Sequence, residues 1–241
     1  MVTCRHSAVM RGVTRPEDAM EEERNKAEVL SLGDGFTWMG SSYPGFPGRG
    51  RLRERMTAAL MRLLAENGIR TAFLRELPGG GLAFRETEPA AFTAAVRYFG
   101  AGSFSERTGT AEGKKLLCPA LSLALLQKDG EGAPVSGYEL ISLGLADEGE
   151  VREACRTAFA AAEVLSAYFR EKGTDLIDVT LHFGKDGDGL CLTGELSPDS
   201  MRLWDAAAHE RLDADRYRKG LGHEEDAYRM IAGRMGIPGG Q

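Results

Sequence analysis

The sequence predicts an α+β protein in two parts, a small N-terminal antiparallel sheet with one helix and a larger C-terminal α+β part. Three observations lead to this prediction. Residues 175–196 alternate apolar and polar side chains on either side of the turn KDGDG, which is typical of a β-hairpin. Residues 148–172 carry apolar side chains at helical spacing and end at Gly173. Residues 71–86 indicate a second hairpin around the turn PGGG.

In chain order, the elements divide the sequence into three segments. Residues 1–25 mix charged and small side chains without a period, so we expect a tail. Residues 26–90 would form the N-terminal domain, with a short strand, a loop rich in Gly, Pro and Ser, a helix over 52–64 and the second hairpin. Residues 91–241 would form the C-terminal domain. Its expected elements are a strand that ends at Arg97, an apolar strand over 121–127, a loop over 128–135, the long helix, the central hairpin and a final helix over 224–235.

Composition excludes several classes of function. The 241 residues are 42% hydrophobic and 27% charged, which is ordinary for a globular protein. A net charge of −6 provides no general attraction for nucleic acid. No apolar run approaches the ~20 residues that span a membrane, and the N-terminal residues lack a hydrophobic signal core, so we expect a cytoplasmic protein. The cysteines and histidines are dispersed, which argues against a zinc site.

Polar side chains gather in the loop that follows the central hairpin. Glu195, Ser197, Asp199 and Arg202 all lie within eight residues, directly after an apolar strand. Two carboxylates, a hydroxyl and a guanidinium at the end of a strand are more typical of a site than of a solvated surface.

A second polar group precedes the middle of the chain. The expected strand ends at Arg97, and glycines follow before Ser103 opens a short helix. This order would place a fixed cation beside backbone N–H groups, a combination that suits a phosphate or a carboxylate. The alternative is that Ser103 only caps the helix and that Arg97 is a surface residue.

Three stretches resemble the SAICAR synthetase family. GELSPDSMRLWD is similar to the family pattern DEISPDxxRLWD, VRYFGAGSFSERTGTAEG to VVRxxxAGSxxxRxGxxEG, and PGRGRLRERMTAALMRLLAENGIRTAF to IPGKGxxxxxxSxxxFxxLxxxGIxTHF. The resemblance covers Arg49 to Met235. It implies the two-part α+β fold of that family and its reaction, in which ATP and Mg²⁺ drive the joining of aspartate to the carboxylate of an aminoimidazole ribotide.

The resemblance also implies roles for individual residues. The residues implied to bind the ribotide are Arg97, Ser103, Ser197 and Arg202. The residues implied to be catalytic are Asp178, Glu195 and Asp199. Those implied to contact the nucleotide are Arg49 and Asp129, and the ligands of the metal are left open.

The departures from the family pattern all fall on the nucleotide side. No hairpin of the form GKxKxVY precedes Arg51, and FTWM at 36–39 replaces the pattern SAxD. Lysines or carboxylates of the family are replaced at five positions, which are Gln127, Ala133, Thr180, His182 and Gly194. Mg²⁺ requires hard oxygen ligands, so these losses predict a weakened site for Mg²⁺ and ATP.

Two further interpretations stay open at this point. In the first, the chain is a non-catalytic paralogue, a pseudoenzyme that senses a ribotide or supports a partner subunit. In the second, it is a repurposed enzyme in which His182 faces Glu195 across the hairpin and performs acid–base chemistry. His182 as an ordinary hairpin residue is the simpler alternative. A homodimer or a complex with a partner subunit is compatible with all of them.

Overall fold

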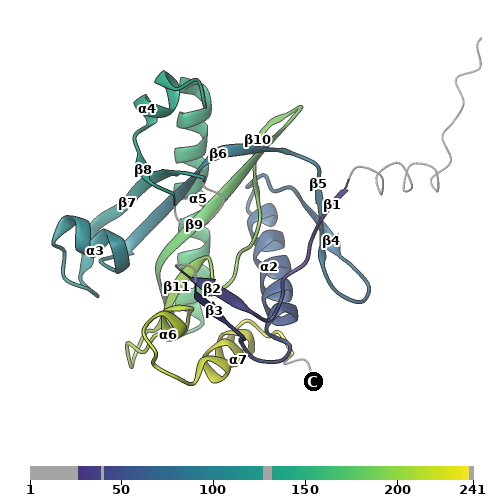
Figure 1. Cartoon of the computed structure of the whole chain (residues 1–241), viewed down its shortest axis with the longest axis vertical. Coiled ribbons are helices and arrows are strands. Elements are labelled where there is room, and N and C mark those ends of the chain that lie inside the picture. Colours follow the sequence, from purple (N-terminus) through teal and green to yellow (C-terminus); the bar gives the residue numbers. More distant parts are fainter. Residues whose placement is uncertain (1–26, 39–40, 127–131, 239–241) are drawn as a thin grey trace, which may run out of the picture.

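The computed structural model describes residues 27–38, 41–126 and 132–238, and its architecture is α+β, as predicted (Figure 1). A small antiparallel sheet has the strand order β1-β5-β4, formed by Ala27–Leu30, Leu82–Arg85 and Phe73–Glu76. The predicted tail at 1–25 lies outside the described residues. The small sheet confirms the expected N-terminal part, including its second hairpin.

A larger antiparallel sheet forms the rest of the scaffold. Its strand order is β10-β9-β6-β7-β8, and β11 also pairs with β9. These strands are β6 (Glu88–Phe99), β7 (Lys115–Leu125), β8 (Pro134–Val135), β9 (Thr174–Asp186), β10 (Gly189–Thr193) and β11 (Met201–Asp205). The hairpin of β9 and β10, with Gly189 opposite Asp186, is the predicted central hairpin.

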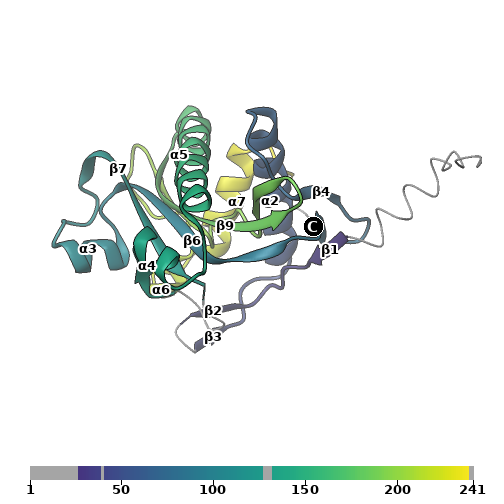
Figure 2. The same cartoon turned by 90° about the horizontal axis from the view of Figure 1, so that it is seen from above.

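One face of the large sheet is covered by the long helix α5 (Glu148–Glu171). Figure 2 shows α5 on one side of β6 and β9 and the short strands β2 (Phe36–Trp38) and β3 (Ser41–Tyr43) on the other. Alternate residues of β6 and β9 face the helix side and belong to the hydrophobic core, among them Val96, Val179 and Phe183. Because side chains alternate along a strand, the residues between them point to the opposite face.

Helix α2 (Arg49–Glu66) joins the two sheets. It begins directly after Gly48, whose φ of 81° turns the chain, and Gly68 with φ of 76° follows its end. The predicted apolar stripe is confirmed, because Leu52, Met56 and Leu60 are at most 4% exposed.

The remaining helices are short. They are α3 (Gly102–Thr108), α4 (Gly137–Ser142), α6 (Asp215–Arg218) and α7 (Glu224–Arg234). Helix α7 confirms the predicted final helix, and it buries Tyr228 and Ile231 completely. None of the helices within the described ranges is long and apolar enough to cross a membrane.

The structure differs from the sequence-based expectation in its strands. The strand expected to end at Arg97 continues to Phe99, and the strand expected over 121–127 begins at Lys115. These two strands pair over most of their length, and this pairing extends each beyond its apolar centre. Strands β2, β3 and β8 form within segments read as loops. The division into domains at residue 90 stays a prediction.

Candidate functional site

A pocket of about 850 Å³ lies on the face of the large sheet opposite α5. Its floor consists of side chains that the strand register places in three rows across the sheet. The first row, which we call the charged row, contains Arg97, Asp178 and Arg202. The next two, which we call the uncharged rows, contain Ala95, Thr180 and Ser122, and then Thr93, His182 and Ala124.

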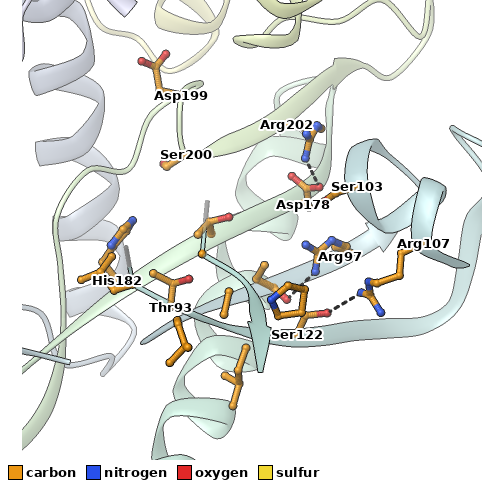
Figure 3. Close-up of a pocket in the computed structure, with 18 of the residues that line it drawn as sticks. Thr93, Arg97, Ser103, Arg107, Ser122, Asp178, His182, Asp199, Ser200 and Arg202 are labelled. Carbon is orange, nitrogen blue, oxygen red and sulfur yellow. Dashed lines mark hydrogen bonds and ion pairs between the residues drawn. The ribbon is translucent and has the colours of Figure 1, made fainter. Parts of the chain in front are cut away.

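The rows give the pocket a polarity. Neighbouring rows are two residues apart along each strand, or roughly 6.6 Å. Burial lowers the pKa of His182, so its imidazole is neutral at pH 7. Figure 3 shows Arg97, Ser103 and Arg202 around Asp178, and Thr93 and His182 at the far end of the floor. The pocket therefore offers arginines at one end and uncharged groups at the other.

Arg202 is held rigidly at the charged end. Its Nη1 donates to Asp178 Oδ2 at 2.8 Å, and its Nε donates to Asp215 Oδ2 at 3.1 Å. Burial alone would lower the pKa of Arg202, but the charges of Asp178 and Asp215 raise it above the ordinary value. The carboxylates that orient Arg202 are therefore those of Asp178 and Asp215, whereas Asp199 pairs with Arg49 and Arg53.

Ser103 and Arg97 approach the same end from α3 and β6, as predicted. The Arg97 guanidinium lies 5.4 Å from the centre of the Phe104 ring. Gly102, with φ of 52°, allows the start of α3 to lie against Arg202, because a Cβ at this position would be 2.5 Å from Arg202 Nη2. Arg97, Ser103 and Arg202 all line the pocket.

A second group of charges forms the wall of the pocket beside α2. Arg53 donates to both oxygens of Glu195, from Nε at 2.7 Å and from Nη2 at 2.6 Å. The same Nη2 lies 2.9 Å from Asp199 Oδ2. Arg49 Nη2 contacts the two oxygens of Asp199 at 2.5 and 2.7 Å, and Tyr228 donates to Oδ1 of the same carboxylate.

Helix α2 supplies these contacts from one stripe. Arg49, Arg53 and Thr57 are four residues apart, so they point in nearly the same direction. Thr57 Oγ1 donates to the carbonyl of Leu196 at 3.1 Å and accepts from its N–H at 3.2 Å. The stripe therefore fixes the loop that carries Glu195 and Asp199.

Two of the predicted site residues are buried rather than exposed to the pocket. Arg49 and Ser197 are both 0% exposed. Ser197 donates to Glu195, and its Oγ accepts from Asp199 N at 3.1 Å. Their predicted contacts with nucleotide and ribotide stay predictions, as does that of Asp129, which lies outside the described residues together with Gln127.

The sequence-based interpretation missed the buried carboxylate of Asp213. Its oxygens accept from the N–H groups of Leu203 and Asp215, both at 2.8 Å. Burial, followed by the neighbouring charge of Asp215, raises the pKa of Asp213 to about 7. The LDADRYR sequence contains both aspartates, but their contacts with the strand β11 and with Arg202 depend on the tertiary fold.

His182 does not face Glu195 across the hairpin. Its register partner on β10 is Thr193, and Gly194 packs against the imidazole. Both oxygens of Glu195 accept hydrogen bonds from Arg53. His182 therefore lies opposite Thr193 rather than Glu195, whose carboxylate is bound by Arg53 of α2, and an acid–base role for His182 stays a prediction.

The carboxylates of the pocket do not suit a divalent cation. Glu195 and Asp199 face the guanidinium groups of Arg53 and Arg49, and Asp178 faces that of Arg202. A magnesium ion at any of these carboxylates would meet a fixed positive charge. Within the described part of the chain, no three His, Cys, Asp or Glu side chains gather closely enough to hold a metal ion.

An antiparallel sheet with arginines converging on one end of a pocket on its open face is an arrangement that suits an anionic small molecule. The family model of SAICAR synthetase matches residues 31–235. The chain belongs to the SAICAR synthetase family.

Individual relatives agree with this assignment. The phosphoribosylaminoimidazole-succinocarboxamide synthase of Lachnoclostridium phytofermentans is 38% identical over 192 residues, which are 79% of this chain and 81% of the relative. The structure of the synthase from Ehrlichia chaffeensis has a TM-score of 0.83 at 26% identity and covers 88% of this chain and 92% of that one. A SAICAR synthetase in complex with ADP has the same TM-score and coverage at 29% identity.

Proposed function

We propose that the pocket binds a phosphoribosyl-aminoimidazole carboxylate, the ribotide on which synthetases of this family act. The observation that carries the proposal is the convergence of Arg97, Ser103 and Arg202 on one end of the pocket. Guanidinium groups in a partly desolvated site bind phosphate and carboxylate strongly. Arg202 has a side chain that is 15% exposed, so part of it is accessible to a ligand.

The uncharged rows suit the rest of this molecule. Two rows extend roughly 13 Å from the charged row, a length that accommodates a ribose and an imidazole ring. Thr93, Thr180 and Ser122 offer hydroxyl groups there, and Ala95 and Ala124 leave room above the sheet. An anionic group would therefore lie over the arginines and the uncharged ring over the hydroxyl groups.

The reaction of the family would then join aspartate to the ribotide at the expense of ATP. The relatives are named as synthases, and one solved structure contains ADP. ATP would supply the activation of the ribotide carboxylate when bound. The described residues of this chain do not suit the magnesium ion that accompanies ATP, so ribotide binding is the part of the function that the pocket supports.

A binding measurement with Arg202→Ala tests the proposal. Loss of a charged hydrogen bond of 1.5–3 kcal/mol should weaken ribotide binding about 10- to 150-fold in isothermal titration calorimetry. Arg152→Ala removes an exposed arginine of α5, which pairs with Glu148, and serves as the control. Unchanged affinity in Arg202→Ala would refute the proposal.

Arg202→Ala also leaves Asp178 buried without its partner and leaves Asp215 with Arg218 alone, which costs about 3–5 kcal/mol of stability. Ser103→Ala avoids this difficulty because it keeps all of the arginines. It should weaken ribotide binding about 5-fold while the midpoint of thermal unfolding stays the same. If both variants bind the ribotide more weakly and Ser103→Ala keeps its unfolding midpoint, the loss of affinity comes from lost contacts and not from lost folding.

A second candidate is a non-catalytic paralogue that senses the ribotide or supports a partner subunit. The pairing of Glu195 and Asp199 with arginines favours it. Thermal shift with the ribotide and with Mg²⁺ and ATP, applied separately, distinguishes the two. A ligand at a hundredfold its Kd adds about 2.7 kcal/mol of stability. Stabilisation by both ligands favours the ligase, and stabilisation by the ribotide alone favours the paralogue.

A further inference from the structure

We propose that Arg53 takes the place of a divalent cation between Glu195 and Asp199, so that the pocket binds its ligand without a metal ion. The part of this inference that concerns the ligand rests on the proposed function. The part that concerns the cation rests on the protein alone. Arg53 is thus a residue that determines specificity, and it acts through the two carboxylates of the pocket wall.

The first argument is the position of the guanidinium. Its Nη2 lies 2.6 Å from Glu195 Oε2 and 2.9 Å from Asp199 Oδ2, so one nitrogen bridges two carboxylates. A bridging position between two carboxylates is also where a divalent cation binds. The Arg53 side chain is 9% exposed, and those of Glu195 and Asp199 are 17% and 11% exposed. A cation from solvent would have to displace the guanidinium.

The second argument is that Arg53 cannot move aside easily. Its Nη1 donates to the carbonyl of Gly33 at 3.1 Å, and its Nε donates to Glu195 Oε1. Its backbone lies within α2, between Leu52 and the fully buried Thr57. Three nitrogen atoms of one planar group are therefore held from two sides, and displacement would break every one of these hydrogen bonds.

The third argument is the charge balance of the wall. Arg49 and Arg53 together carry two positive charges, and Glu195 and Asp199 carry two negative ones. A divalent cation added to this group would leave an excess of positive charge in a partly buried site. The sum is already zero without it.

The floor supplies no substitute for these carboxylates. Thr180 and His182 occupy the uncharged rows, and Asp178 holds Arg202. Glu106 also lines the pocket, but it is exposed on α3, on the side of the charged row. Within the described residues, the lining therefore offers no second place at which carboxylates gather around a cation.

Titration with Mn²⁺, followed by the electron paramagnetic resonance of the free ion, tests the position of the cation. The wild-type protein and Arg53→Lys should leave Mn²⁺ free. Arg53→Gln should bind it at least ~10-fold more tightly, and the double variant with Glu195→Gln should lose this gain. Arg51→Gln changes a partly exposed arginine two residues away on α2 and should behave as the wild type.

Three results would overturn the proposal. The first is that the wild-type protein binds Mn²⁺ and that Glu195→Gln removes this binding. The second is that folded Arg53→Gln binds Mn²⁺ no more tightly than the wild type, and the third is that the double variant keeps the higher Mn²⁺ affinity of Arg53→Gln. If Arg53→Gln does not fold, Mn²⁺ binding is compared between the wild type, Arg53→Lys and Glu195→Gln. Binding of Mn²⁺ by the wild type or by Arg53→Lys that depends on Glu195 would contradict the proposal.

Calorimetry with the ribotide tests the consequence for the ligand. The affinity of the wild-type protein should be the same with EDTA and with excess Mg²⁺. Binding that requires Mg²⁺ would overturn the inference. Absence of ribotide binding under both conditions would refute the proposed function instead, and the Mn²⁺ titrations would stand independently of it.

Discussion

Thr57→Val should destabilise the protein although it barely changes the shape of the side chain. Thr57 is 0% exposed, and its hydroxyl both donates to the carbonyl and accepts from the N–H of Leu196. Valine replaces this hydroxyl with a methyl group, and its helix propensity is close to that of threonine. The change therefore removes two hydrogen bonds between α2 and the loop of Glu195 with little other effect.

The expected loss of stability follows from the backbone groups of Leu196 that the variant leaves without a hydrogen-bond partner. Leu196 is 2% exposed, so its N–H and C=O groups would lose their partner without gaining water. Each buried, unsatisfied polar group costs about 1–3 kcal/mol. For the two groups together we expect a loss of about 2–6 kcal/mol. For a chain of 241 residues, this corresponds to a fall of roughly 4–24 °C in the midpoint of thermal unfolding.

Urea denaturation and differential scanning calorimetry would measure this loss. Thr57→Ser is the matched control, because it keeps the hydroxyl and removes one methyl group, for a cost of about 1 kcal/mol. The valine variant should therefore be the less stable of the two. If Thr57→Val lies within 0.5 kcal/mol of the wild type, the two hydrogen bonds do not fix the loop, and the reasoning fails.

Two other predictions concern the floor of the pocket. Gly102→Ala should weaken ribotide binding in calorimetry, because its Cβ would displace Arg202. Gly109→Ala is the control, because Gly109 also has a left-handed backbone but has open space around it. The affinity of Gly109→Ala for the ribotide should equal that of the wild type. Burial lowers the pKa of His182, so the stability it contributes is present above its unfolded pKa of ~6.5 and is lost as the pH falls through its folded value. His182→Gln should then lose less stability than the wild type between neutral and acidic pH in urea denaturation, and equal losses would contradict this.

Much of the fold could be predicted because its signals are local. The apolar stripe of α2, the turn KDGDG and the stop at Gly173 each depend on residues near one another in the chain. Pairing between β6 and β7 is different, since the partner strand supplies the hydrogen bonds that extend each strand past its apolar centre. Local patterns therefore locate these strands but not their ends.

The site was predictable to the extent that its residues follow a family pattern. Arg97, Ser103 and Arg202 line the pocket together, as the resemblance implies. The partners of Arg202 were not predictable, because Asp178 and Asp215 reach it from separate elements. Arg53 gave no signal at all. It reads as one of several arginines on a helix, and its bond to Glu195 spans 142 residues of sequence.

The stripe of Arg49, Arg53 and Thr57 also has a consequence for how this chain can change in evolution. One residue inserted or deleted within the first two turns of α2 would rotate part of the stripe by about 100°. The guanidinium groups and the hydroxyl could then no longer reach the 195–199 loop together. Outward-facing positions such as Arg62, whose side chain is 51% exposed, carry no such constraint. In descendants of this chain, α2 should therefore tolerate substitution on its outer side and resist any change in length within its first two turns.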